Sequence, residues 1–411
     1  MNKEMKKVPD VRFKGFTDDW EQHKLGDCFE ERRENMPDGE LLSVTINDGI
    51  KKFSELGRHD NSNDDKSKYK RVCIGDIAYN SMRMWQGASG YSIYEGIVSP
   101  AYTVLKSKSD INSRFASYLF KCQEMMHTFQ VNSQGITSDN WNLKFPALSQ
   151  IKVKLPCQIY EQKKVADYLN NIDGFVVLHQ RKLDQLQTLK KYCLQNMFPA
   201  KEGKVPAIRF KGFTDDWKQH KLGELLAFRN GFNGNLQQYG SGIPLISVMD
   251  ILNNSFIFSD TVQTKANLNE TEIKRYIVHY GDVLFQRSSE TVEDAGSSNV
   301  YLDSQNIAVF GGFVICGRKI GDYDPVFFRY LLDSNKIRHQ IVIRAQGVQH
   351  INVSQDTLED VSIDLPSKSE QKMIGVCLRN LDNFITLQQH KLDQLQSLKK
   401  FMLQNLFIQR K

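Results

Sequence analysis

The sequence repeats itself over long distances. The segment VPDVRFKGFTDDWEQHKLG at residues 8–26 returns as VPAIRFKGFTDDWKQHKLG at residues 205–223, with 16 of 19 positions identical. A second segment, KLDQLQTLKKYCLQNMF at residues 182–198, returns as KLDQLQSLKKFMLQNLF at residues 391–407, with 13 of 17 identical. These offsets of 197 and 209 residues far exceed the roughly 20–50 residues of a solenoid repeat. The chain is therefore expected to hold two copies of one frame around two different inserts.

The repeats divide the 411 residues into six parts, and this length fits two or three domains. The predicted parts are a first segment (1–27), a variable domain (28–155), a helix with a linker (156–204), the repeated segment (205–223), a second variable domain (224–365) and a C-terminal helix (366–411). Both variable domains have short apolar, β-rich runs, each set followed by one predicted helix, at residues 115–129 and 327–342. The fold class expected is mixed α/β.

Two long amphipathic helices are predicted, one in each half. Their apolar residues recur at alternating spacings of four and three, the pattern of a heptad seam. The predicted seam consists of Leu169, Ile172, Val176, Leu183 and Leu186, and of Leu378, Leu381, Ile385, Leu392 and Leu395. From residue 161 to 198 the first helix would be ~57 Å long, a length that suits a spacer. We further expect the segment at residues 8–26 to lie beside the end of the second helix, where a third copy of the repeat would otherwise follow.

Polar residues interrupt both seams at matching places, His179 with Gln388 and Lys190 with Lys399. Two interpretations are open. Polar seam residues can fix the register and partner of a helix pair at a cost in stability. They can also extend to water from the edge of the apolar stripe.

Composition is that of an ordinary globular protein, with 40% hydrophobic and 25% charged residues. The first residues, MNKEMKKVPD, carry charge instead of a signal-peptide core, and no apolar run is long enough to cross a bilayer. Seven scattered cysteines without a C-x-x-C pair indicate reduced thiols, so we expect a cytoplasmic protein without a structural metal. A net charge of +6 permits nucleic-acid binding but does not require it.

The usual catalytic motifs are absent. The sequence has no phosphate-binding G-x-x-x-x-G-K-[ST] loop, no G-x-S-x-G elbow and no H-E-x-x-H pair. Ser99-Pro-Ala-Tyr102 resembles a degraded methyltransferase S-P-P-Y loop, but a proline at a strand edge is the simpler interpretation. Pro37-Asp38 with Asp64-Asp65-Lys66 fits a nuclease pattern in form only, because the surrounding residues are typical of a solvated loop. No catalytic residue is therefore predicted.

Two variable domains that alternate with two near-identical helices resemble the specificity (S) subunit of type I restriction–modification systems. The resemblance covers essentially the whole chain and rests on the R-F-K-G-F-T-D-D-W segments, the E-Q-K helix starts at residues 161–163 and 370–372, and the K-L-D-Q-L-Q-x-L-K-K helix ends. It implies that each variable domain is a target recognition domain that reads one half of a split sequence in double-stranded DNA. It also implies that the helices form an antiparallel, pseudo-two-fold coiled coil that sets the spacing and docks methyltransferase (M) subunits, two of them.

The resemblance further implies that this chain is not a catalyst and binds no cofactor itself. S-adenosylmethionine, ATP and Mg would be bound by the M subunits and by the restriction (R) subunits of the full complex. The two domains differ in length, which is expected if the two half-sites differ.

Two polar loops in each variable domain are the candidates for DNA contact, because Arg, Asn, Gln and Ser side chains recognise base edges. The candidate base-reading residues are Asn80, Arg83, Trp85, Gln86, Gln134, Ser138 and Asn140 in the first domain, and Gln286, Arg287, Ser288, Gln346, Gln349, His350 and Asn352 in the second. The candidate phosphate contacts are Lys66, Lys68, Lys70, Arg71, Lys265, Lys274 and Arg275. For each residue the alternative is a turn cap or a solvated face.

Two other functions compete with DNA recognition. A coiled-coil adaptor would bind proteins through the repeated helices without contacting DNA, and a self-sufficient DNA enzyme would cut or modify its target. Salt-dependent binding to duplex DNA would distinguish recognition from the adaptor, because phosphate contacts give a steep salt dependence.

Overall fold

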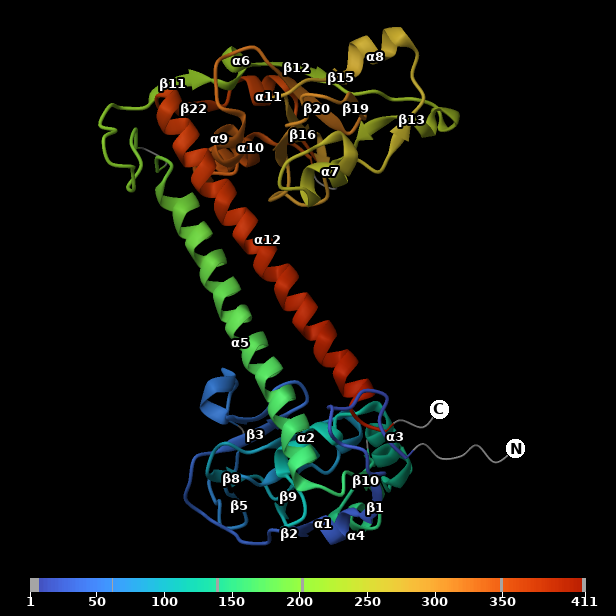
Figure 1. The fold of residues 1–411 in the computed structure, drawn as a ribbon. Helices are drawn as coiled ribbons and strands as arrows, with labels where there is room; N and C mark the ends of the chain where they lie inside the picture. The colour runs from blue at the N-terminus through green and yellow to red at the C-terminus, as the bar shows by residue number, and fades with distance from the viewer. Residues whose placement is uncertain (1–6, 61, 138–139, 201–202, 348–349, 409–411) are drawn as a thin grey trace. The chain divides into compact units, whose positions relative to one another are not determined.

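The computed structural model describes residues 7–60, 62–137, 140–200, 203–347 and 350–408. The chain divides into two compact units, unit 1 with Met1–Gln180 and His390–Lys411, and unit 2 with Arg181–Gln389. Each unit contains one copy of the repeated segment, one variable domain and parts of both long helices. Helices and sheets occur in both units, so the expected mixed α/β class is confirmed (Figure 1).

The two long helices are α5 (Ile159–Asn196) and α12 (Lys368–Asn405), each 38 residues long and unbroken (Figure 1). In unit 1 the N-terminal part of α5 shares a hydrophobic core with the C-terminal end of α12. In unit 2 the C-terminal part of α5 shares a core with the N-terminal part of α12. This is the pairing of antiparallel helices. All ten predicted seam residues are buried or half-buried.

The lysines that interrupt the seams have carboxylate partners on the opposite helix. Within unit 2, Lys190 Nζ lies 2.5 Å from Asp382 Oδ1, and within unit 1, Lys399 Nζ lies 2.5 Å from Asp173 Oδ1. Each lysine side chain is only 31% exposed. The interpretation that these lysines fix the helix register is therefore supported over the one in which they extend into water.

Both copies of the repeated segment fold back onto the first turn of a long helix. In unit 1, Arg12 donates from Nε and Nη2 to the two carboxylate oxygens of Glu161, at 2.7 and 2.8 Å. In unit 2, Arg209 makes the same two bonds to Glu370, at 2.7 and 2.8 Å. The glutamate side chains are 3% and 0% exposed. The glutamate of each E-Q-K start is thus the buried partner of the arginine in each R-F-K-G-F segment.

The end of each long helix is also bonded to a repeated segment. Ile208 N donates to Asn196 O at the end of α5 in unit 2, at 2.9 Å. Val11 N donates to Asn405 O at the end of α12 in unit 1, also at 2.9 Å. The first segment therefore takes the place beside α12 that the second takes beside α5, as the sequence led us to expect.

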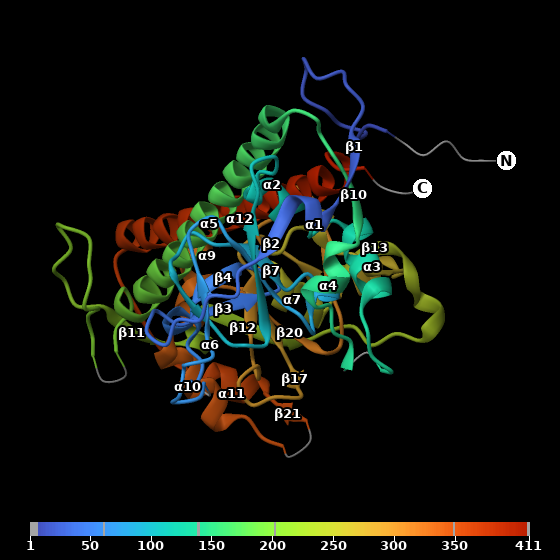
Figure 2. The same ribbon diagram turned by 90° about the horizontal axis from the view of Figure 1, so that it is seen from below.

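Unit 1 is built on an antiparallel four-stranded sheet in the order β2-β9-β6-β7. Its strands are β1 (Glu21–Lys24), β2 (Phe29–Glu31), β3 (Leu42–Thr45), β4 (Gly49–Lys52), β5 (Lys70–Val72), β6 (Ile77–Asn80), β7 (Ser89–Tyr91), β8 (Gly96–Val98), β9 (Tyr102–Ser107) and β10 (Lys152–Leu155). Its shorter helices are α1 (Leu25–Cys28), η1 (Phe53–Leu56), η2 (Met84–Gln86), α2 (Ser113–Leu119), α3 (Gln123–Asn132) and α4 (Phe145–Ser149). The helix α2 lies against α5 in both views (Figures 1 and 2).

Unit 2 repeats the central sheet in the order β12-β20-β16-β18 and adds a second sheet in the order β14-β13-β19-β15. Its strands are β11 (Lys218–Lys221), β12 (Leu226–Asn230), β13 (Tyr239–Ile246), β14 (Lys265–Ala266), β15 (Ile277–Val278), β16 (Val283–Gln286), β17 (Ser288–Ser289), β18 (Ser298–Val300), β19 (Ala308–Phe310), β20 (Val314–Lys319), β21 (Ile351–Asn352) and β22 (Ser362–Leu365). Its shorter helices are α6 (Leu222–Leu225), η4 (Leu236–Gln238), α7 (Val248–Asn253), η5 (Ser259–Thr261), α8 (Glu270–Tyr276), α9 (Pro325–Leu332), α10 (Asn335–Arg344) and α11 (Gln355–Glu359). In the central strands β6 and β16, the first three side chains are fully buried, which explains their continuous apolar sequence.

One sequence-based expectation about the helices was wrong in detail. The single helix predicted after each sheet is two helices, α2 with α3 in unit 1 and α9 with α10 in unit 2. Cys122 and Ser334 precede the second helices with extended backbone angles, which interrupt the helical hydrogen bonding. The apolar pattern continues across these turns, so periodicity could not show the break. Within the part of the chain that is described, no helix is long and apolar enough to cross a membrane.

Candidate nucleic-acid interface

In unit 1, two polar segments that are far apart in the sequence meet at the end of strand β6. Leu143 N donates to Ser81 O at 2.8 Å and thereby joins the segment after α3 to the loop after β6. The rings of Trp85 and Trp141 pack edge to face across the two segments, with their centroids 5.2 Å apart. The two loops predicted to contact bases therefore form one continuous surface.

Unit 2 joins its two loops in the same way. Val353 N donates to Arg287 O at 2.9 Å, the counterpart of the bond in unit 1. Strands β17 and β21 add an antiparallel pairing of Ser288 with Asn352. The backbone arrangement is thus common to both units, whereas the side chains that it carries differ.

The second loop of each unit is closed by two reciprocal backbone hydrogen bonds, Gln134 with Asn142 and Gln346 with Asn352. The glycine after each glutamine has a positive φ, 148° and 134° respectively, which favours glycine at that position. A Cβ at Gly347 would lie only 1.9 Å from a carbonyl oxygen of the same loop. The described ends of each loop are therefore held together by backbone hydrogen bonds.

The described candidate base-reading residues differ in their exposure. Those that are exposed are Arg83, Gln86, Gln134, Asn140, Arg287, Gln346, His350 and Asn352. Those that are half-buried are Asn80, Trp85 and Ser288. Gln286 is only 6% exposed, and its Nε2 donates to Ser288 O at 2.9 Å. Ser138 and Gln349 lie outside the described residues.

Several of these side chains support their own loops. Asn80 Oδ1 accepts from Met82 N at 3.0 Å, and Trp85 Nε1 donates to Met82 O at 3.1 Å. Among the described residues, the side chains of Arg83 and Gln86 make no hydrogen bond. The polar groups of these two residues are therefore available to a ligand.

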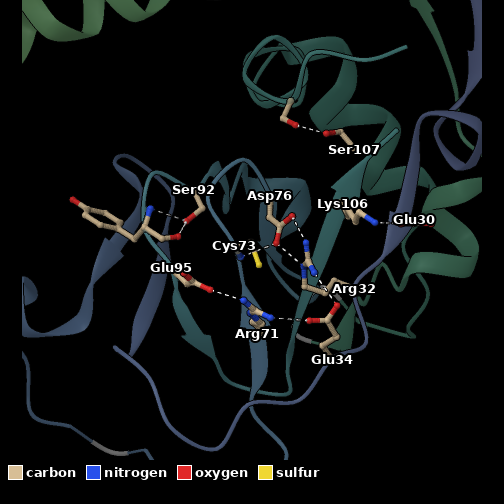
Figure 3. Close-up of polar contacts among 12 residues, drawn as sticks. Glu30, Arg32, Glu34, Arg71, Cys73, Asp76, Ser92, Glu95, Lys106 and Ser107 are labelled. Atoms are coloured by element: carbon tan, nitrogen blue, oxygen red, sulfur yellow. Dashed lines mark hydrogen bonds and ion pairs between the residues drawn. The ribbon is translucent and has the colours of Figure 1, made fainter. Parts of the chain in front are cut away.

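The candidate phosphate contacts also fall into two groups. Lys68, Lys265, Lys274 and Arg275 are exposed, and Lys66 is half-buried. Lys70 Nζ instead donates to Tyr102 O at 2.8 Å. Arg71 lies between Glu95 and Glu34, at 2.6 and 3.4 Å, and its hydrogen bond to Glu95 raises its pKa (Figure 3). The charge of Arg71 is thus compensated within the unit.

A buried acidic turn precedes the central strand in both units, and sequence reasoning did not identify its role. Asp76 Oδ2 accepts from Arg32 Nε at 2.7 Å and from Cys73 N at 2.8 Å (Figure 3). Asp282 lies 2.8 Å from Arg318 Nε. The arginines come from β20 in unit 2 but from the segment after β2 in unit 1. The signal in the sequence is a Gly-Asp pair at residues 75–76 that recurs at residues 281–282, and it marks a structural ion pair.

The described residues include no group of three or more His, Cys, Asp or Glu side chains that could hold a metal ion. The loop surfaces instead carry amide, guanidinium, hydroxyl and indole groups on a fixed backbone. Such groups donate and accept hydrogen bonds and stack on planar ligands, as required for contact with base edges. Trp141, which was not among the predicted readers, belongs to this surface through its contact with Trp85.

The sequence also matches a known protein family. The model described as "Type I restriction modification DNA specificity domain" matches residues 17–188 and again residues 214–397. The chain belongs to this family. It therefore contains two DNA specificity domains, which supports DNA recognition over the protein-only adaptor and identifies the chain as a specificity component, not a catalyst.

Individual relatives agree with the family. The chain is 22% identical over 404 residues to the type I restriction enzyme MjaVIII specificity subunit of Methanocaldococcus jannaschii, covering 93% of this chain and 91% of the relative. Its fold is similar to the crystal structure of a type I restriction–modification S subunit from M. genitalium, with a TM-score of 0.60, 14% identity, and coverage of 98% and 100%. A chain from a study of complex assembly in a type I system gives a TM-score of 0.51 at 16% identity, with coverage of 93% and 96%.

Proposed function

We propose that this chain selects a bipartite DNA target, with the domain at residues 28–155 reading one half and the domain at residues 224–365 reading the other. The observation that carries the proposal is the duplicated loop pair, in which one backbone hydrogen bond is common to both units and the exposed side chains differ. Two readers of different half-sites need a common scaffold with different donors and acceptors, because base edges are distinguished by hydrogen-bond pattern.

Arg83 and Gln86 are the strongest reader candidates in unit 1, since both are exposed and their side chains have no hydrogen bond among the described residues. Arginine suits the acceptor edge of guanine and glutamine suits adenine. In unit 2 the corresponding surface presents Gln346, His350 and Asn352. The exposed lysines near these domains would supply phosphate contacts, which add affinity without sequence information.

The test is to replace Arg83 by alanine and Gln86 by alanine, and to map methylated sites with the partner methyltransferase present. We expect each change to relax one position of one half-site and to cost about 1–3 kcal/mol in target binding, while the other half-site is unchanged. Arg33→Ala is the matched control, because Arg33 is an exposed arginine paired with Glu31. Equal losses of affinity for target and non-target DNA would mean that these residues contact only the DNA backbone or only support the protein fold.

A second feature supports partner docking by the long helices. Outside its seam, α5 has exposed apolar residues at Phe175, Leu178, Leu189 and Tyr192, between 45% and 59% exposed. At the equivalent positions α12 has Phe384, Leu387, Leu398 and Phe401, of which all but Leu398 are exposed. Exposed apolar stripes of this kind mark interaction surfaces. Because the stripe is duplicated, we propose that it docks two methyltransferase subunits, one on each helix.

Stoichiometry tests this second part. Leu178→Asp or Leu387→Asp should each remove one methyltransferase subunit, as measured by native mass spectrometry, and the double variant should remove both. Gln187→Asp is a control, because this exposed residue of α5 lies two and a half turns after Leu178 and therefore on the opposite side of the helix from the stripe. Retention of two subunits by the double variant would place docking elsewhere.

The remaining components are proposed to come from the partners. Restriction subunits would join the full complex in the cytoplasm, and S-adenosylmethionine, ATP and Mg would bind to the partner subunits. Equilibrium dialysis of the isolated chain against each cofactor is the direct measurement. Saturable binding of S-adenosylmethionine to this chain alone would contradict the assignment.

A further inference from the structure

One tyrosine in each variable domain is bonded to the long helices. In unit 1, the hydroxyl of Tyr118 on α2 donates to Asp173 Oδ2 on α5, at 2.7 Å. The other oxygen of this carboxylate, Oδ1, lies 2.5 Å from Lys399 Nζ on α12. A single carboxylate therefore links the variable domain to both helices.

Unit 2 contains the same link. The hydroxyl of Tyr330 on α9 donates to Asp382 Oδ2 on α12, at 2.7 Å, and Asp382 Oδ1 lies 2.5 Å from Lys190 Nζ on α5. Tyr330 is 3% exposed and the Asp382 side chain is 14% exposed. The roles of the two long helices are exchanged between the units, but the atoms and distances are the same.

These links differ from ordinary surface ion pairs in two respects. Both carboxylate oxygens are used, and the hydrogen bonds have the short length of charge-assisted bonds. Burial and the neighbouring aspartate raise the pKa of each tyrosine, so the phenol remains protonated and donates. The tyrosines are also retained in helices that otherwise diverge, SRFASYL in α2 and PVFFRYLL in α9.

A second contact anchors the other end of the same short helices. Gln162 Oε1 accepts from Asn112 N, the residue that caps α2, and Gln371 Oε1 accepts from Asp324 N, the residue that caps α9, both at 2.9 Å. Each short helix is thus fixed to a long helix at its start by the glutamine of E-Q-K and near its end by the tyrosine. Two separated polar anchors, added to the shared hydrophobic core, oppose rotation of the domain against the helix more strongly than one anchor would.

We propose that Tyr118 and Tyr330 are positioning residues that fix the orientation of each recognition domain on the helix pair, and thereby restrict the spacing between half-sites that the protein accepts. The inference rests on the proposed bipartite recognition. A domain that tilts on its helix would reach half-sites one base pair nearer or farther, because each base pair shifts a half-site by ~3.4 Å along the duplex. The tyrosines themselves need not contact DNA.

The experiment uses Tyr118→Phe, Tyr330→Phe and the double variant in complex with methyltransferase subunits. Methylation rates are measured on duplexes with the wild-type spacer and with one base pair more or fewer. We expect the preference for the wild-type spacer to fall roughly tenfold in the double variant, because each change removes one hydrogen bond to a charged group. Lys399→Met and Lys190→Met should reduce the preference in the same direction.

Tyr301→Phe is the matched control, since its hydroxyl donates to Asn306 O at 2.8 Å within its own domain. It should leave the spacer preference unchanged. An unaltered preference in the double variant, with or without a loss of thermal stability, would show that the links only stabilise the fold and would overturn the inference. Failure of the proposed function looks different, because wild-type protein would then show no dependence on either half-site.

Discussion

The buried pair of Arg209 with Glu370 gives the sharpest stability prediction. Glu370 is fully buried, and Arg209 donates two hydrogen bonds to it and a third to Asp215 O at 2.6 Å. Arg209→Leu would leave a buried carboxylate without its partner, which costs about 3–5 kcal/mol. Arg209→Lys keeps the charge but loses the bidentate hydrogen bonding to Glu370, so we expect it to lower the free energy of unfolding by about 2–3 kcal/mol.

Hydrogen exchange by mass spectrometry is the suitable assay, because a chain of two units need not unfold in one step. A cost of about 3 kcal/mol should raise the opening equilibrium on the order of 100-fold in peptides from residues 205–223 and from the first turns of α12. Arg33→Leu is the control, since the Arg33 side chain is 78% exposed and its pair with Glu31 should contribute little. If Arg209→Leu changes protection no more than this control does, the ion pair does not hold the segment in place.

Three further predictions concern other parts of the chain. Burial, followed by the nearby Lys399, lowers the pKa of Lys121 to about 8, while Asp173 and Asp48 oppose the shift. Between pH 8 and about 10.5 the folded state then binds fewer protons than the unfolded state, so the stability of unit 1 increases with pH. Hydrogen-exchange protection of unit 1 should therefore rise across that pH range, and Lys121→Met should abolish the rise. In native protein, maleimide labelling mapped by mass spectrometry should modify exposed Cys157 well before Cys316. Cys316 is buried, and burial raises the pKa of its thiol to about 12. Equal labelling rates of the two cysteines would contradict the burial of Cys316. Gly347→Ala should weaken DNA binding at one half-site by at least tenfold, because the new Cβ would meet the carbonyl oxygen of His350. Hydrogen-exchange protection of unit 1 should be unchanged. An unchanged affinity in a DNA-binding assay would exclude that loop from the interface.

The long helices were predictable because one local property, the spacing of apolar residues, determines them. The predicted start at residue 161 differs by only two residues from the observed start of α5, and the length of 38 residues is the same. The partners of Lys190 and Lys399 were not predictable. Asp382 and Asp173 lie on the opposite helix, and no local pattern shows which residue of a distant segment a side chain will meet.

The variable domains were predictable in part, most clearly in their central strands. The apolar runs that form β6 and β16 are continuous, whereas β13 contains a register shift between Tyr239 and Ile243 and two glycines with positive φ. Such a strand has no clean alternation, so the second sheet of unit 2 was not predicted. Similarly, Gln286 belongs to a polar loop in the sequence, but it closes the buried strand β16 and is itself buried.

The distribution of the repeat has a physical explanation. Several residues kept in both copies have partners in other kept parts. Arg12 and Arg209 bind the glutamates of the E-Q-K starts, and the backbone N–H just before each arginine donates to the carbonyl oxygen at the end of a repeated helix. A change on one side of such a contact leaves a buried charge without its partner, so both sides are constrained together. The exposed loop side chains of Arg83 and Gln86 have the opposite situation, because within the unit only the backbone that carries them is hydrogen-bonded. Their identity is therefore free to differ between the two domains without cost to the fold, which is the condition for one frame to carry two different recognition surfaces.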